Sequence, residues 1–318
     1  MTVPSPPSGP VRIGPVPPPA EGYSARPETA PGLTGTLAAG TTTVLVPARA
    51  TADGLGEWAA ASGKTQLALA LAESLWQSRD IDLLLWITAS SRAAVLSGLA
   101  QAAPVVLGAG PASDAGPLAA RFLRWLGETG RRWLLVLDNL TDPGDLDGLW
   151  PAGTAGRTVI TTRTVVRAPD DRDIQLPVGP FSPRESLSYL MGRLAADPDQ
   201  RLGAIDLVDE LAGEPLALAQ ASAVIVSSPL TCRDYRDHFL RRRDELAAAT
   251  GRPVSAGEVS WTLSVEQADR LARGDAARSL LAFAAMLDPD GTPAAVFTRW
   301  AICVRSGRLA GRINPCTS

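Results

Sequence analysis

The chain has 318 residues, 45% of them hydrophobic, and a formal net charge of -3 at pH 7. This length suits about two or three domains, and without an excess of positive charge no global field attracts nucleic acid or a membrane surface. Three widely spaced cysteines and one histidine argue against a disulfide framework, a zinc site and a serine or cysteine hydrolase, and the lack of a secretory signal or a long apolar run predicts a cytoplasmic protein.

The N-terminal residues 1–24 are rich in proline, which lacks a backbone donor and favours extended conformers, so we expect a disordered or loosely docked arm. From about residue 25 to residue 180, short apolar runs alternate with stretches of helical periodicity. The expected strands are Thr41–Pro47, Ile81–Thr88 and residues 131–140, 156–163 and 172–179. Helices are expected between them, and the first begins at Lys64.

The expected strands are apolar along most of their length, which predicts a parallel sheet covered by helices on both faces. In such a sheet, ligands bind beyond the carboxyl ends of the strands. The tripeptide Gly63-Lys64-Thr65 follows the first strand, Asp138 follows the third and Arg163 follows the fourth. The sequence therefore predicts that these side chains meet at one edge of the sheet.

Beyond about residue 180 the pattern becomes helical. Ser182 and Glu185 have the spacing of a capping box, and a break at Gly213–Pro215 separates two later helices. Residues 231–246 have the pattern of an amphipathic helix, and two or three shorter helices are expected from about residue 260. This change of pattern predicts a helical region that is distinct from the sheet.

A phosphate-binding loop ends with Gly-Lys-Thr at a helix start, as at Gly63-Lys64-Thr65. There the helix N-terminus favours an anion, the ammonium reaches the phosphates and the threonine hydroxyl coordinates Mg²⁺. Trp58 stands where such a loop has its first glycine, and Gly54-Leu55-Gly56 lies too far upstream. A left-handed Trp58 costs about 1–2 kcal/mol, which weakens binding about tenfold without abolishing it. Alternatively, Ala60–Gly63 forms the cradle of amides and the preceding segment loops out.

Asp138 closes the apolar run "WLLVLD", where an acid is either a turn former or the Walker-B carboxylate that holds Mg²⁺. The next residue, Asn139, cannot accept a proton from an attacking water, so fast hydrolysis is disfavoured unless Asp142 substitutes. Arg163 closes "TVITTR" and is either a surface charge or a sensor that contacts the γ-phosphate. Each residue therefore has a structural and a functional interpretation.

Four stretches, in this order and spacing, resemble the NB-ARC branch of the signal-transducing STAND ATPases: "GKTQLALALA", "WLLVLDN", "GRTVITTR" and "GEPLALAQASA". The resemblance covers about residues 25–297. It implies an α/β P-loop NTPase domain over residues 25–180, with a parallel sheet sandwiched by helices. It further implies a small helical domain over residues 181–250 and an incomplete winged-helix-like region with an irregular tail over residues 251–318.

The resemblance also implies a set of nucleotide contacts: Gly63, Lys64, Thr65, Gln66 and Pro215. Of these, Pro215 would lie on the adenine side. Thr65 and Asp138 would hold Mg²⁺, and Asp138 and Arg163 would act at the γ-phosphate. The weaker stretch "ARPETAPGL" is similar to the segment that such proteins place before the first strand, near the adenine.

By this resemblance the chain is an ADP- and ATP-binding regulatory switch with slow or no hydrolysis, in signal transduction or transcriptional regulation. Its expected partners are the nucleotide, Mg²⁺ and another protein or a second copy, with no nucleic acid and no membrane. The alternative is a degenerate P-loop fold that acts as a nucleotide-independent protein-interaction module. Because the family's His-Asp pair and sensor repeats are missing and the composition shifts over residues 299–318, we suspect a truncated C-terminus.

Overall fold

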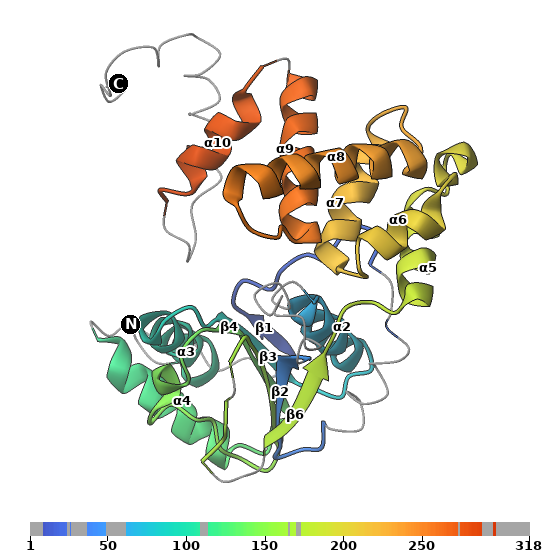
Figure 1. The fold of residues 1–318 in the computed structure, drawn as a ribbon. Coiled ribbons are helices and arrows are strands. Elements are labelled where there is room, and N and C mark those ends of the chain that lie inside the picture. The colour runs from blue at the N-terminus through green and yellow to red at the C-terminus, as the bar shows by residue number, and fades with distance from the viewer. Residues whose placement is uncertain are drawn as a thin grey trace, which may run out of the picture.

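The computed structural model describes residues 9–23, 26, 37–48, 62–108, 114–164, 166–169, 173–272, 274–287 and 295–296. Figure 1 shows a sheet flanked by helices in the lower half of the molecule and a group of helices in the upper half. The predicted succession of an α/β part and a helical part is visible in this arrangement.

The sheet has six parallel strands within the described residues. They are β1 (Val11–Ile13), β2 (Thr42–Pro47), β3 (Leu83–Thr88), β4 (Trp133–Leu140), β5 (Gly156–Thr162) and β6 (Asp173–Val178). Their order across the sheet is β1-β3-β4-β5-β2-β6, and every pairing is parallel. The predicted parallel sheet is therefore confirmed, with β5 inserted between β2 and β4.

Helices cover both faces of this sheet, which explains why the central strands are apolar along their length. The covering helices are α2 (Lys64–Gln77), α3 (Arg92–Leu107) and α4 (Ala115–Glu128). In β3, Leu85 and Ile87 belong to the core shared with α3 and α4, whereas Leu84 and Trp86 belong to the core shared with α2. We call the six strands and these three helices the sheet unit.

The prediction that residues 1–24 form a disordered arm is wrong for residues 9–23, which contain β1. Val11 and Ile13 pack against the sheet core, and Arg12 stacks 4.4 Å from the Trp76 ring and donates two hydrogen bonds to Glu73 of α2. Gly14 then turns the chain with φ 94°, and a Cβ there would lie 1.9 Å from the carbonyl oxygen of Trp86. The proline content concealed this short strand because its partners are far away in the sequence.

The upper part consists of helices around a separate apolar core. They are α5 (Pro183–Arg193), α6 (Ala204–Glu210), α7 (Pro215–Val226), α8 (Cys232–Thr250) and α9 (Ala256–Ala272). The predicted capping box is confirmed, since Ser182 and Glu185 exchange side-chain and backbone hydrogen bonds at the start of α5. Two short 3-10 helices, η2 (Pro143–Leu146) and η3 (Pro198–Arg201), lie in connections. We call α5–α9 the helical unit.

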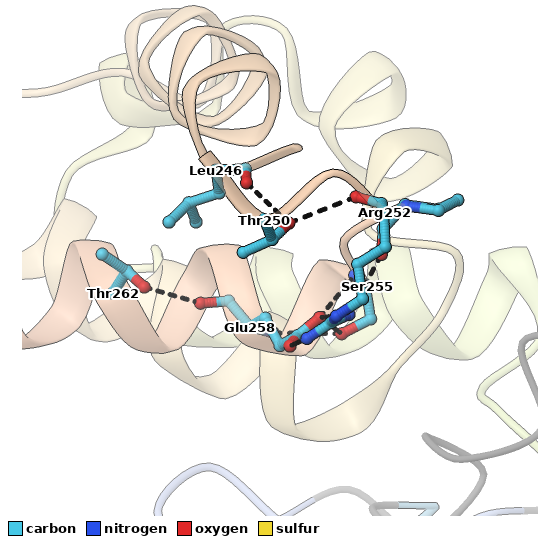
Figure 2. A network of polar contacts seen from close by, with 7 residues as sticks. Leu246, Thr250, Arg252, Ser255, Glu258 and Thr262 are labelled. Atoms are coloured by element: carbon cyan, nitrogen blue, oxygen red, sulfur yellow. Dashed lines mark hydrogen bonds and ion pairs between the residues drawn. The ribbon is translucent and has the colours of Figure 1, made fainter. Parts of the chain in front are cut away.

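The apolar core of the helical region continues across the domain boundary that was expected after residue 250. Val259 and Leu263 of α9 are buried in the same core as α5–α8. Figure 2 shows how the turn before α9 is fixed: Glu258 accepts hydrogen bonds from Arg252 and from the backbone of Ser255. α9 therefore belongs to the helical unit.

Beyond α9 the structure describes α10 (Ala276–Ala284), which contacts α9. The region expected to resemble a winged helix, residues 251–318, is described only in part, so that interpretation stays a prediction. No helix within the described residues is long and apolar enough to cross a membrane.

Candidate functional site

The N-terminus of α2 lies at the carboxyl edge of the sheet, where the sequence predicts an anion site. Gly63 precedes the helix with φ 85° and ψ 21°, a left-handed conformation that glycine adopts without strain. As a glycine it offers no capping side chain, and the first turn of α2 has no acidic residue. Because the first amides of a helix lack intrahelical acceptors and carry the positive end of its dipole, this terminus favours a phosphate.

Lys64 is the only lysine in the sequence; every other basic residue except His238 is an arginine. Its side chain is buried, with 6% of the residue exposed, and its Nζ lies 3.4 Å from Ser62 Oγ. Burial and the positive charge of Arg163 lower the pKa of Lys64, while Asp138 acts in the opposite direction. A phosphate at the start of α2 would stabilise both cations, which suits this lysine to anion binding.

Thr65 and Asp138, which are far apart in the sequence, are joined by a hydrogen bond. Thr65 Oγ1 donates to Asp138 Oδ1 over 2.7 Å, and Thr161 Oγ1 donates to the same oxygen over 2.6 Å. Hydroxyl and carboxylate oxygens are the hard ligands that Mg²⁺ prefers. The oxygens of Thr65 and Asp138 therefore fit a magnesium ion that would take its remaining ligands from phosphate and water.

A β-bulge positions Asp138. β4 continues two residues past Asp138 to Leu140, and its register with β5 shifts between Leu137 and Leu140. Within the bulge Asn139 has φ 60°, and its N–H donates to Thr161 Oγ1 over 2.7 Å. Thr161 thus fixes both the backbone after Asp138 and the carboxylate itself. Sequence analysis missed Thr161, although it lies two residues before Arg163.

Arg163 follows the last residue of β5 and is exposed. It is close enough to Lys64 for its charge to lower the pKa of that side chain. The structure therefore brings Lys64, Thr65 and Asp138 together and places Arg163 near them, at the carboxyl edge of the sheet.

Gln66 and Pro215 lie in different surroundings. Gln66 accepts a hydrogen bond from the Ala20 N–H over 2.7 Å and donates one to the Pro18 carbonyl over 3.4 Å, so its side chain binds the N-terminal segment. Pro215 begins α7, two residues after Gly213, whose carbonyl accepts a hydrogen bond from the Phe181 N–H over 2.8 Å. Their predicted nucleotide contacts remain predictions.

Two further expectations concern residues near this edge. Asp142, the alternative acid for hydrolysis, caps η2 by accepting a hydrogen bond from the Gly144 N–H over 2.9 Å. Trp58 and the upstream segment Gly54–Gly56 lie outside the described residues, as do Ala60 and Ala61. The enlarged phosphate loop therefore remains a prediction from the sequence.

No protein-family model and no curated protein matches the chain. Among solved structures, it is similar to the ORC2 protein of Aeropyrum pernix in ADPNP–ADP complexes, with 14% identity over 75% of this chain and 65% of that chain and a TM-score of 0.40. It is also similar to a Signal Transduction ATPase with Numerous Domains (STAND) from Pyrococcus horikoshii that has a tetratricopeptide repeat sensor. The identity is 16% over 66% of this chain and 31% of that chain, with a TM-score of 0.41. A third similar structure is Cdc6p of Pyrobaculum aerophilum, with 16% identity over 72% of this chain and 64% of that chain and a TM-score of 0.40.

The chain spans less than two thirds of the length of each of these three proteins. Likeness at this level says nothing of what the chain binds. Within the chain itself, β5 separates β2 from β4, and the helix after β2 begins at Lys64. The chain has an α/β fold with a parallel sheet covered by helices on both faces.

Proposed function

We propose that the chain is an ADP- and ATP-binding regulatory switch of the STAND type, with slow or no hydrolysis. The observation that carries the proposal is the hydrogen bond of 2.7 Å between Thr65 and Asp138. Thr65 is the residue after Lys64, whose buried side chain begins α2 at its N-terminus. A lysine, a hydroxyl and a carboxylate in this arrangement serve phosphate and Mg²⁺ binding together.

The proposed roles follow from the chemistry of each group. Lys64 would bind the phosphates as a point charge, and Thr65 and Asp138 would hold Mg²⁺. When bound, the ion would neutralise charge on the phosphates. Arg163 would donate charge-assisted hydrogen bonds to the terminal phosphate, because its guanidinium is exposed near Lys64.

Slow turnover is proposed because an acid is missing where an attacking water would need a base. Asn139 follows Asp138 in the bulge, and its amide does not accept a proton. Asp142 is engaged as the cap of η2. Since a general base contributes about 10²–10⁴-fold to a rate, nucleotide binding here would be separated from rapid hydrolysis.

Titration calorimetry with ADP, with and without Mg²⁺, tests the proposal. We expect Mg²⁺-dependent binding by the unchanged chain, and a loss of about 10–100-fold in affinity in Lys64→Ala, because a hydrogen bond to a charged group is removed. A matched control is Arg132→Ala, which removes an exposed cation that pairs with Asp82 at the opposite edge of the sheet.

Equal ADP affinity in Lys64→Ala would contradict the proposed site. If neither ADP nor ATP binds at millimolar concentration, the chain is better described as a nucleotide-independent interaction module. A thermal shift gives the same distinction, because ligand at 100 times its dissociation constant adds about 2.7 kcal/mol to the free energy of unfolding.

A further inference from the structure

The N-terminal segment from Pro15 to Tyr23, which we call the strap, contacts both units of the molecule. On the sheet unit, its Ala20 N–H and Pro18 carbonyl are hydrogen-bonded to the side chain of Gln66, two residues after Lys64. On the helical unit, it contacts α5. One short stretch of chain therefore reaches from the proposed phosphate site to the first helix of the helical unit.

The contact with α5 is polar and close. Glu21 forms an ion pair of 2.7 Å with Arg193, and the Glu21 carbonyl accepts a hydrogen bond from Tyr189 Oη over 3.3 Å. The next residue, Gly22, has φ 70°, and a Cβ there would lie 2.3 Å from the Arg193 side chain. The strap is thus fitted to this side of α5 by charge and by shape.

Arg26, three residues beyond the strap, makes a second set of bridges. Its Nη1 donates to the carbonyls of Ser62 and Gly179, each over 3.1 Å, and its Nη2 donates to the Pro180 carbonyl over 2.8 Å. It also lies 3.7 Å from Glu185 of α5. The guanidinium therefore joins the residue before Gly63 to the connection between β6 and α5.

Arg26 is 5% exposed, so its charge is held inside the protein. A buried charge is tolerated where hydrogen bonds and an opposite charge compensate it. Three carbonyls, the Glu185 carboxylate and the Phe181 ring, 5.0 Å from the guanidinium carbon, supply this compensation. Ser62 and Gly179 adjoin α2 and β6 of the sheet unit, whereas Glu185 lies in α5 of the helical unit, so separating the units would leave Arg26 and Glu185 poorly paired.

We propose that Arg26 is a positioning residue for the nucleotide site and that, with the strap, it couples this site to the docking of the helical unit. The inference rests on the proposed function. Both flanks of Lys64 are held, Ser62 by Arg26 and Gln66 by the strap, and the same chain segment holds α5. Because binding free energies are linked, displacement of α5 weakens nucleotide binding, and bound nucleotide strengthens the docking of α5.

The ion pair at the strap allows a test by charge exchange. We expect Glu21→Arg and Arg193→Glu each to weaken ADP binding about fivefold, the lower end of typical coupling between sites. The double variant restores the pair with the charges exchanged, so its affinity should return to within about twofold of the unchanged chain. Glu245→Arg is the matched control, since Glu245 pairs with Arg242 within α8 alone.

Arg26 is tested with two substitutions. Arg26→Lys keeps the charge but loses the fork that reaches three carbonyls, and Arg26→Gln loses both. We expect ADP affinity to fall in the order unchanged chain, Arg26→Lys, Arg26→Gln, each measured on folded protein. A merely structural role would lower the unfolding temperature and leave the ADP affinity of the folded variants unchanged.

Amide hydrogen exchange without nucleotide separates this inference from the proposed function. We expect faster exchange in α5 of Glu21→Arg than in α5 of the unchanged chain, and recovery in the double variant. If the unchanged chain binds no ADP, the proposed function fails, and unaltered exchange in α5 would then show that the strap does not hold the helical unit. If ADP binds but the single charge reversals leave its affinity unchanged, or the double variant stays as weak as they are, the coupling is refuted.

Discussion

The two edges of the central sheet handle charge in different ways. At the amino edge, Arg132 and Asp82 form an ion pair of 2.9 Å with side chains 48% and 33% exposed. At the carboxyl edge, Lys64 and Asp138 are buried. Burial and then the positive charge of Arg163 lower the pKa of Lys64, and the charge of Asp138 raises it. One edge holds its charges as an ion pair in contact with solvent, whereas the other holds an ammonium and a carboxylate inside the protein.

This difference distinguishes stability from function. An exposed ion pair contributes about 0–1 kcal/mol and needs no further explanation. Burying a cation costs free energy and a neighbouring cation adds to that cost, whereas a bound anion would reduce it. The carboxyl edge therefore suits an anionic ligand, and the following predictions test that contrast from the largest expected effect to the smallest.

The largest effect is expected from Asp138→Asn. This change keeps an acceptor oxygen for the hydroxyls of Thr65 and Thr161 but removes the charge that would bind Mg²⁺. We expect ADP to bind Asp138→Asn equally with and without Mg²⁺ in calorimetry. Asp142→Asn, which changes the acid that caps η2, should keep the Mg²⁺ dependence. Tightening of ADP binding by Mg²⁺ in Asp138→Asn would exclude Asp138 as a ligand.

Gly63→Ala should have a smaller effect, on stability. The residue adopts φ 85°, which costs a non-glycine residue about 1–2 kcal/mol. No atom within 4 Å would collide with the added methyl group, so the strain is confined to the backbone. Urea unfolding should show a decrease of about this size. Gly130→Ala is the control, because Gly130 also has open space and is not in the left-handed region; equal losses in both variants would refute the explanation.

The residues at these edges also show what could be predicted from the sequence. The interior strands could be predicted because their apolar runs are local signals. Asp138 could be placed because it closes such a run, and Lys64 because Gly63-Lys64-Thr65 stands at the start of a helix. Thr161 and Arg26 could not. Thr161 acts through a bulge that no local pattern announces, and Arg26 binds backbone carbonyls, which are the same for every residue type.

β1 was hidden for a related reason. Three residues in a proline-rich segment give too short a pattern for a strand, and the contacts that stabilise it, with Glu73, Trp76 and β3, are formed only in the folded chain. The packing of α9 against α5–α8 was missed because the boundary expected after residue 250 followed a family pattern, whereas Val259 and Leu263 of α9 lie in the same core as those helices.

A further small effect is expected at the amino edge. The hydrogen bond from Arg132 lowers the pKa of Asp82 from its ordinary value of 3.8. The stability that this pair contributes is therefore present above pH 3.8 and is lost as the pH falls through the lowered pKa. We expect the difference in free energy of unfolding between the unchanged chain and Asp82→Asn to shrink in this acidic range. ADP affinity at neutral pH should be the same for both, and a loss of affinity would remove the functional distinction between the edges.

The smallest effect concerns the protonation of Lys64. Its pKa is lowered from the ordinary value of 10.5, first by burial and then by Arg163. Between the lowered pKa and 10.5, the unfolded chain binds the proton more strongly than the folded chain, so raising the pH through this range increases the free energy of unfolding. Lys64→Met lacks this contribution, and urea unfolding of the two proteins should diverge in that direction.

Because Lys64 is the only lysine, selective ¹³C labelling of lysine Cε gives a single NMR signal whose titration reports this pKa directly. We expect a midpoint below 10.5 in the free protein. Bound ADP should raise it, since phosphate stabilises the ammonium and offsets both burial and the repulsion from Arg163. Asp138→Asn should shift the midpoint of the free protein further down, because the carboxylate counteracts the other two effects. A midpoint that ADP leaves unchanged would mean that the phosphates bind away from Lys64, and the buried ammonium would then need another explanation.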